Sequence, residues 1–212
     1  MELITKLNNF MTDIEVDYAI CGGHAIDLFL GRNTRPHKDL DVAVFWESRD
    51  KIIQYLLNEG WEIYEPIGTA YLHKINSVEC QKRIKENIWC VRPDNRHYKF
   101  TEHENNLYAV DFGNSEQTEF DYIEFLFNTR NEGCFLYSRN KDIAVCLDDA
   151  IFKANDTPYL APEIVLLYKS TAIDNIDYQM DYDNASLKMN DKQLTWLKKS
   201  LAVMFPNGHK WL

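Results

Sequence analysis

The stretch CGGHAIDLFLGRNTRPHKDLDVAVF, residues 21–45, constrains the fold more than any other part of the chain. Two adjacent glycines stand between a short apolar run and a segment whose apolar side chains recur at helical spacing. A second apolar run comes after this segment, and it opens with two aspartates separated by one residue. This order predicts a strand, a glycine turn, a helix and a second strand, with a polar site at the strand ends.

The glycine pair is the first half of this candidate site. Gly22 and Gly23 lack Cβ, so a ligand phosphate can approach the backbone closely at the turn. The N–H groups and the dipole at the start of the next helix favour an anion there. A strand, two glycines and a helix also describe an ordinary turn, so the glycines alone do not decide between a turn and a phosphate site.

The aspartates are the second half. Residues i and i+2 of a strand point to one face, so the carboxylates of Asp39 and Asp41 should lie side by side while Leu40 and Val42 point into the core. Two such anions repel each other unless a cation lies between them. Mg²⁺ prefers oxygen ligands and typically binds one or two carboxylates plus substrate phosphates. A solvated strand end explains an isolated Asp-x-Asp, but the preceding glycine turn favours a site for metal and phosphate.

Periodicity along the 212 residues predicts a mixed α/β (α+β) fold, in which a mixed β-sheet is flanked by helices. Helices are expected at 2–12, 23–31, 49–59 and about 190–204, and strands at 16–21, 39–45, 61–65, 87–93, 106–112, 119–128 and 134–139. The run NTRNEG marks a hairpin, and Pro162 suits the first turn of a helix. We therefore expect a catalytic domain over 1–147 and a small helical C-terminal region over 148–212 packed on it.

Composition limits the partners. The net charge of −10 argues against nucleic-acid binding, which needs clustered Lys and Arg, and suits a cationic partner or bound metal ions. The five cysteines are odd in number and form no CxxC pair, which argues against a disulfide framework or a zinc cluster and favours free thiols. No segment reads as a signal peptide or a membrane span, so the expected location is the cytoplasm.

Residues 22–45 resemble the signature of the nucleotidyltransferase superfamily, and within it the aminoglycoside 2''-adenylyltransferase-like family, with the lincosamide nucleotidyltransferases as relatives. The resemblance continues in NIWCVRP, YIEFLFN, FLYSR, PYLAPEIVLLYKS and the final PNGHKWL, so it covers most of the chain. Residues 94–118 have no clear counterpart and resemble an insertion.

The resemblance implies a nucleotidyltransferase-type sheet and an Mg²⁺-dependent enzyme of antibiotic resistance. Two Mg²⁺ ions held by Asp39 and Asp41 would assist transfer of a nucleoside monophosphate, AMP from ATP or its equivalent from another nucleoside triphosphate, to a hydroxyl of a small acceptor. The acidic charge suits a cationic acceptor such as an aminoglycoside. The alternative is a toxin–antitoxin-type protein of the same fold that modifies or binds a protein or RNA partner, although a binding protein has no need of three converging acids.

A third carboxylate is expected on a neighbouring strand, as metal ligand or as general base. Glu124 stands inside the apolar run YIEFLF, where an unpaired buried acid would be costly, and it matches the third acid of the family. Asp121 is the alternative, but strand alternation places it on the opposite face. A third possibility is that Glu124 is a solvated acid on an edge strand.

The resemblance also implies cationic nucleotide contacts. Lys169 would reach the triphosphate, although a surface lysine is the alternative, and Arg139 would bind phosphate or form a surface ion pair. Arg35 matches the family motif and is a further candidate nucleotide contact. The acids of the run 174–183 would attract a polyamine acceptor or belong to a solvated loop.

Overall fold

The computed structural model describes residues 2–95, 98–112 and 116–212. It contains two compact units, each built from two segments of the chain. The first unit comprises Met1–Tyr18 and His37–Asn128, and the second comprises Ala19–Pro36 and Thr129–Leu212. Residues 96–97 and 113–115 of the predicted insertion lie outside the described residues.

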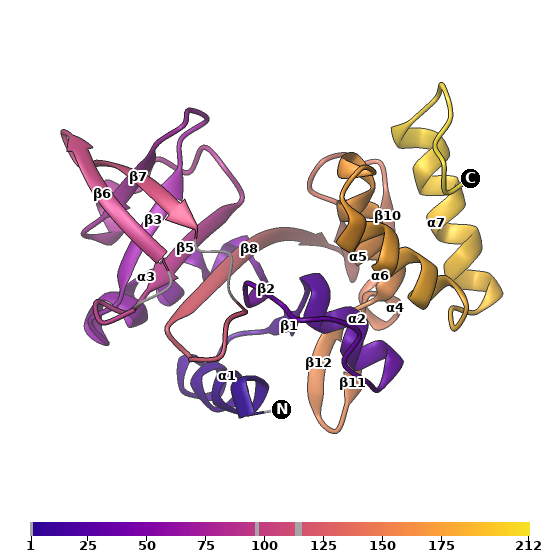
Figure 1. Ribbon diagram of the computed structural model, residues 1–212, viewed down its shortest axis with the longest axis horizontal. Helices are drawn as coiled ribbons and strands as arrows, with labels where there is room; N and C mark the ends of the chain where they lie inside the picture. The colour runs from indigo at the N-terminus through magenta and orange to yellow at the C-terminus, as the bar shows by residue number, and fades with distance from the viewer. Residues whose placement is uncertain (1, 96–97, 113–115) are drawn as a thin grey trace. The chain divides into compact units, whose positions relative to one another are not determined.

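The first unit is a mixed sheet with helices (Figure 1). Its elements are α1 (Glu2–Ile14), β2 (Asp41–Phe45), η1 (Trp46–Ser48), α3 (Arg49–Asn58), β3 (Glu62–Pro66), β4 (Leu72–Ile75), η2 (Val78–Cys80), β5 (Asn87–Val91), β6 (Tyr98–Glu104), β7 (Leu107–Phe112) and β8 (Tyr122–Asn131), whose last residues extend into the second unit. The strand order is β2-β8-β5-β3-β4-β7-β6. Only the β2–β8 pair is parallel among these described neighbours, and the others are antiparallel.

The predicted insertion forms part of this sheet. It supplies the hairpin β6–β7, whose two turn residues Asn105 and Asn106 have positive φ angles of 48° and 66°. A two-residue turn of this kind matches the twist of a hairpin and favours Asn or Gly. Tyr98 on β6 is buried with Tyr64 and Tyr122, so the hairpin completes an aromatic cluster of the core.

The second unit combines short strands with a group of helices. Its elements are β1 (Tyr18–Ile20), whose first residue belongs to the other unit, α2 (Gly22–Leu30), β9 (Cys134–Leu136), β10 (Ala144–Cys146), α4 (Leu147–Ala150), β11 (Ile151–Ala154), β12 (Thr157–Leu160), α5 (Pro162–Lys169), η3 (Ser170–Ala172), α6 (Ile176–Ser186) and α7 (Asp191–Met204). The hairpin β11–β12 places β12 parallel to β1, and β9 pairs with β10 and with the end of β8. Helix α5 packs against α2, α6 and α7.

Most of the predicted helices, and the predicted hairpin turn, are confirmed. The predicted helices correspond to α1, α2, α3 and α7, and Gly31 ends α2 in the left-handed conformation with a φ of 72°. Pro162 is the first residue of α5, and the hairpin turn at NTRNEG contains Glu132 and Gly133 at positive φ. The mixed sheet flanked by helices therefore agrees with the predicted fold class.

The predicted division of the chain needs correction. The region 148–212 is not helical throughout, because it contains the hairpin β11–β12. Helix α2 packs against α5 and α6, so residues 19–36 group with the C-terminal unit, and the expected boundary at 147 falls inside that unit. Strands of four residues carry too little alternation to be separated from the start of a helix by sequence pattern.

A buried ion pair fixes the segment between η2 and β5. Arg49 is 1% exposed, and its Nη2 donates to Glu65 Oε2 at 3.1 Å while its Nε donates to Gln81 Oε1 at 2.7 Å. Glu65 also accepts hydrogen bonds from the backbone N–H groups of Lys82 and Arg83. One buried carboxylate thus ties a helix side chain to a loop backbone.

We expect Arg49→Met to lower the free energy of unfolding by about 3 kcal/mol, because it leaves the Glu65 carboxylate buried without its cation. The matched control is Arg83→Met, since the Arg83 side chain makes an exposed pair with Asp50 whose loss should cost less than about 1 kcal/mol. Urea unfolding of both variants measures the difference. Equal losses of unfolding free energy in the two variants would show that the buried pair stabilises the protein no more than the exposed pair does.

Candidate active site

The register of β2 against β8 brings two predicted site residues together. Asp41 is the Cα partner of Glu124 in this parallel pair, and the Glu124 N–H donates to the Leu40 carbonyl at 2.9 Å. Neighbouring positions of this kind place side chains on the same face of a sheet. Asp39 lies two residues before Asp41 and is exposed, whereas Leu40 and Val42 are fully buried, as the predicted alternation requires.

Neutral donors surround the Glu124 carboxylate. Asn87 Nδ2 donates to Oε1 at 2.6 Å, and the Tyr122 hydroxyl donates to Oε2 at 3.5 Å. Burial raises the pKa of Glu124 to about 7, the charge of Asp39 adds to this rise, and the hydrogen bonds oppose it. Glu124 can therefore exchange a proton near neutral pH.

The segment that precedes β2 is held by residues that the sequence patterns did not single out. The Tyr98 hydroxyl donates to the Lys38 carbonyl, and the Tyr98 ring stacks on Tyr122 with centroids 4.1 Å apart. Gln117 donates its backbone N–H to the His37 carbonyl at 2.9 Å and its side-chain amide to the Tyr122 carbonyl at 2.8 Å. Asn87 opens the family-like run NIWCVRP without having been singled out, and Gln117 lies in the segment 94–118, which has no family counterpart.

The carboxylates of Asp39, Asp41 and Glu124 fit the divalent metal that the fold family implies. All three offer only oxygen ligands, which are those that Mg²⁺ prefers. Asp41 and Glu124 are held on adjacent strands, and Asp39 precedes them on an exposed backbone segment. Asp121 lies one residue before β8 and is not a register partner of Asp41 in the described pairing, so its role as the alternative third acid stays a prediction.

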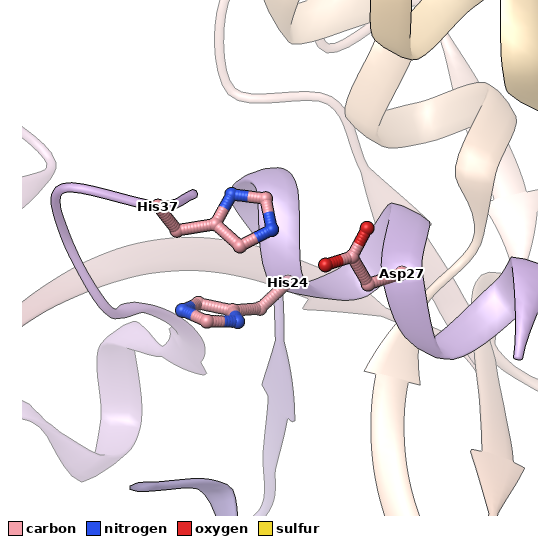
Figure 2. Close-up of side chains that lie close together, drawn as sticks. All are labelled: His24, Asp27 and His37. Atoms are coloured by element: carbon pink, nitrogen blue, oxygen red, sulfur yellow. The ribbon is translucent and has the colours of Figure 1, made fainter. Parts of the chain in front are cut away.

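In the second unit, the glycine turn has the expected conformation. Gly22 begins α2 with a φ of 63°, a region that favours glycine, and Gly23 is buried. His24 and Asp27 both extend from α2 (Figure 2). Asp27 Oδ1 accepts from the backbone N–H of Thr34 at 2.9 Å and from its hydroxyl at 2.6 Å, which fixes the loop after the helix.

Asp181 brings together Arg35 and Lys169, which are two of the predicted nucleotide contacts. We had expected this acid to lie in a polyamine site or in a solvated loop. Asp181 is fully buried on α6 and accepts from Arg35 Nε at 3.2 Å and Arg35 Nη2 at 3.0 Å, while Lys169 Nζ lies 2.8 Å from its Oδ2. Lys169 also lies 4.3 Å from the centroid of the Tyr178 ring. The run 174–183 is therefore not a solvated loop, because its residues 176–183 belong to α6, and Lys169 is not a surface lysine.

Arg139 has a different environment. Its side chain is exposed, its Nη1 donates to the Tyr168 carbonyl at 2.6 Å and to Thr171 Oγ1 at 2.9 Å, and its guanidinium lies over the Tyr168 ring. It thus caps the carbonyl end of α5, where a cation is favourable. In the described residues, Arg139 is held by these contacts to Tyr168 and Thr171 rather than by the predicted surface ion pair.

These features agree with the comparisons to known proteins. Residues 3–71 match the model of the aminoglycoside-2''-adenylyltransferase family. The predicted family resemblance is confirmed over these residues. The nucleotidyltransferase assignment thus rests on the stretch that carries the glycine turn and the paired aspartates.

Two solved structures with TM-scores above 0.5 support the nucleotidyltransferase fold. The solution structure of the antibiotic-resistance factor ANT(2'')-Ia matches 97% of this chain and 92% of its own, with a TM-score of 0.53 and 13% identity. Its crystal structure with adenylyl-2''-tobramycin matches 96% of this chain and 99% of its own, with a TM-score of 0.51 and 12% identity. The lincosamide adenylyltransferase LnuA matches 86% of this chain and 96% of its own at 16% identity, with a lower TM-score of 0.49. No curated protein matches the sequence significantly.

In the part of the chain that the structure describes, no helix is both long and apolar enough to cross a bilayer.

Ionisation of Glu124 should make the metal-free protein less stable as pH rises. The pKa is raised from 4.5 to about 7 in the folded state, so the contribution of the protonated acid is complete below pH 4.5 and is lost as pH rises through 7. In EDTA, we expect Glu124→Gln to gain on the order of 2 kcal/mol of unfolding free energy relative to the native chain between pH 5 and pH 8.

The control for that measurement is Glu119→Gln, which removes an exposed carboxylate just before β8 and should show no such trend. Urea unfolding at both pH values gives the comparison. A difference between Glu124→Gln and the native chain that stays constant with pH would contradict the raised pKa.

Removing the Asp181 charge should destabilise the second unit. Asp181→Asn leaves Arg35 and Lys169 without their shared anion, and loss of one partner from a buried pair costs about 3–5 kcal/mol. Asp183→Asn on the same helix changes an exposed acid and is the matched control. Thermal unfolding followed by circular dichroism should show a large loss of Tm for the first variant only, and similar Tm values would contradict the assignment.

Proposed function

We propose that the chain transfers a nucleoside monophosphate, AMP from ATP in the first instance, to a hydroxyl group of a small acceptor in an Mg²⁺-dependent reaction. The observation that supports this most is the β2–β8 register, which sets Asp41 beside Glu124 with Asp39 two residues away. Three carboxylates in this arrangement repel one another unless cations neutralise them. The family match over residues 3–71 includes the two aspartates.

Asp39, Asp41 and Glu124 would hold the metal. Bound divalent ions would neutralise phosphate charge and clamp the attacking and leaving oxygens of an in-line displacement. In that reaction the acceptor oxygen forms a bond to the α-phosphorus and pyrophosphate leaves. With its pKa near 7, Glu124 is suited to receive the proton of the acceptor hydroxyl, although a purely metal-binding role remains the alternative.

The second unit would contribute nucleotide contacts of its own. Gly22 opens α2 with a backbone that a phosphate can approach closely, and Arg139 keeps an exposed guanidinium. Arg35 and Lys169 share Asp181, and Arg35 Nη1 also lies 3.8 Å from Asp177 Oδ2, so each of these cations already has an anionic partner in the protein. These roles stay predictions of the family resemblance.

A cationic aminoglycoside is the acceptor that we favour. The net charge of −10 suits a cation, and ANT(2'')-Ia, whose fold this chain shares, was crystallised with adenylyl-2''-tobramycin. Pyrophosphate release tests this when four nucleoside triphosphates are each combined with aminoglycosides, lincosamides or no acceptor. No release with any of these acceptors would favour the toxin–antitoxin alternative.

Asp41→Asn should lower turnover by more than about 10²-fold while leaving the fold intact, because it removes one charge from the proposed metal site.

Glu124→Gln should lower turnover by roughly 10²–10⁴-fold if Glu124 is the base, with nucleotide affinity retained, and should also shift the Mg²⁺ dependence if it binds metal.

Asp13→Asn and Glu119→Gln are the matched controls, since both remove exposed acids of the same unit. Pyrophosphate release and nucleotide binding are measured for all four variants. Near-native turnover of Asp41→Asn at saturating Mg²⁺ would show the metal assignment to be wrong.

A further inference from the structure

Two of the five cysteines face each other across the β9–β10 ribbon. All five are free thiols in the structure, but Cys134 and Cys146 are Cα partners in the antiparallel register. The Leu147 N–H donates to the Gly133 carbonyl at 2.9 Å, just outside this pair. That bond identifies Cys134 and Cys146 as a non-hydrogen-bonded pair, the kind in which opposed side chains approach most closely.

The geometry suits a covalent link. In a non-hydrogen-bonded antiparallel pair the Cα atoms are about 4.5 Å apart and both side chains lie on one face. Disulfides join Cα atoms that are roughly 4.4–6.8 Å apart. The two sulfurs can therefore be bonded by rotation of the side chains, without a shift of either strand.

Access distinguishes this pair from the two buried cysteines. Cys146 is exposed and Cys134 is partly exposed, whereas Cys21 and Cys90 are buried. A small oxidant can therefore reach Cys146 first.

We propose that Cys134 and Cys146 form a reversible dithiol–disulfide site whose oxidant is a low-molecular-weight disulfide such as glutathione disulfide. The Cys146 thiolate attacks one sulfur of glutathione disulfide, whose S–S bond breaks and releases one glutathione thiolate. The Cys134 thiolate then attacks the Cys146 sulfur and displaces the second glutathione thiolate. The two cysteines lose two electrons and two protons, and glutathione disulfide is reduced to two glutathione molecules.

The bond would close the loop that carries Arg139. Residues 135–145 lie between the two cysteines, and the Tyr137 N–H donates to the Ile143 carbonyl at 3.0 Å near the loop's base. Arg139 lies in this loop and contacts Tyr168 at the end of α5. Oxidation restricts the unfolded chain, so the oxidised protein should unfold at a Tm higher by about 5 °C.

Peptide mapping of the full chain tests the proposal directly. Cleavage after Arg139 and Lys141 separates the cysteines onto the tryptic peptides 131–139 and 142–153. After treatment with glutathione disulfide we expect these peptides to be joined by a disulfide, with the Tm raised, and dithiothreitol should reverse both changes. Separate peptides carrying glutathione or free thiols, with no linked product, would overturn the proposal.

Single variants assign each cysteine its role. Cys134→Ser should abolish the linked product and accumulate glutathione on peptide 142–153, because no second thiolate can displace it. Cys146→Ser should abolish both the linked product and the glutathione on peptide 142–153. Cys80→Ser is the control and should form the linked product as the native chain does, and loss of the link in that variant would contradict the assigned pairing.

Discussion

The parallel pairing of β2 with β8 is the constraint on which the candidate site depends. It sets Asp41 beside Glu124, which two isolated strands would avoid because like charges repel. The pairing persists because the opposite face of β2 is buried, with Leu40 and Val42 fully removed from solvent. Hydrophobic burial therefore holds two carboxylates in an arrangement that their charges disfavour.

The carboxylates of Glu65, Asp181 and Glu124 differ in the groups that surround them. Glu65 faces the guanidinium of Arg49, and Asp181 faces both Arg35 and Lys169, so these two carboxylates have cationic partners within the protein. Glu124 instead receives hydrogen bonds from the neutral side chains of Asn87 and Tyr122. Such donors orient a carboxylate without cancelling its charge, which fits a group that binds a cation or takes up a proton.

The hairpin β6–β7 shows how an insertion can support a site. It joins the far edge of the first unit's sheet, yet Tyr98 stacks on Tyr122 and donates to the Lys38 carbonyl beside Asp39. The strand that carries Glu124 and the backbone that carries Asp39 are thus held by one side chain from residues 94–118. This segment has no counterpart in the family motifs, so no sequence pattern indicated its contribution.

Sequence alone determined the elements with a strong local signal: the glycine turn, helix α2 with its stop at Gly31, the alternation around Asp39 and Asp41, and the family resemblance. Local signals suffice there because glycine conformation and strand periodicity depend on adjacent residues. Tertiary structure decided which strands pair, that 19–36 group with the C-terminal helices, and that Asp181 joins Arg35 to Lys169. These depend on contacts between residues far apart in the chain, which no local pattern encodes.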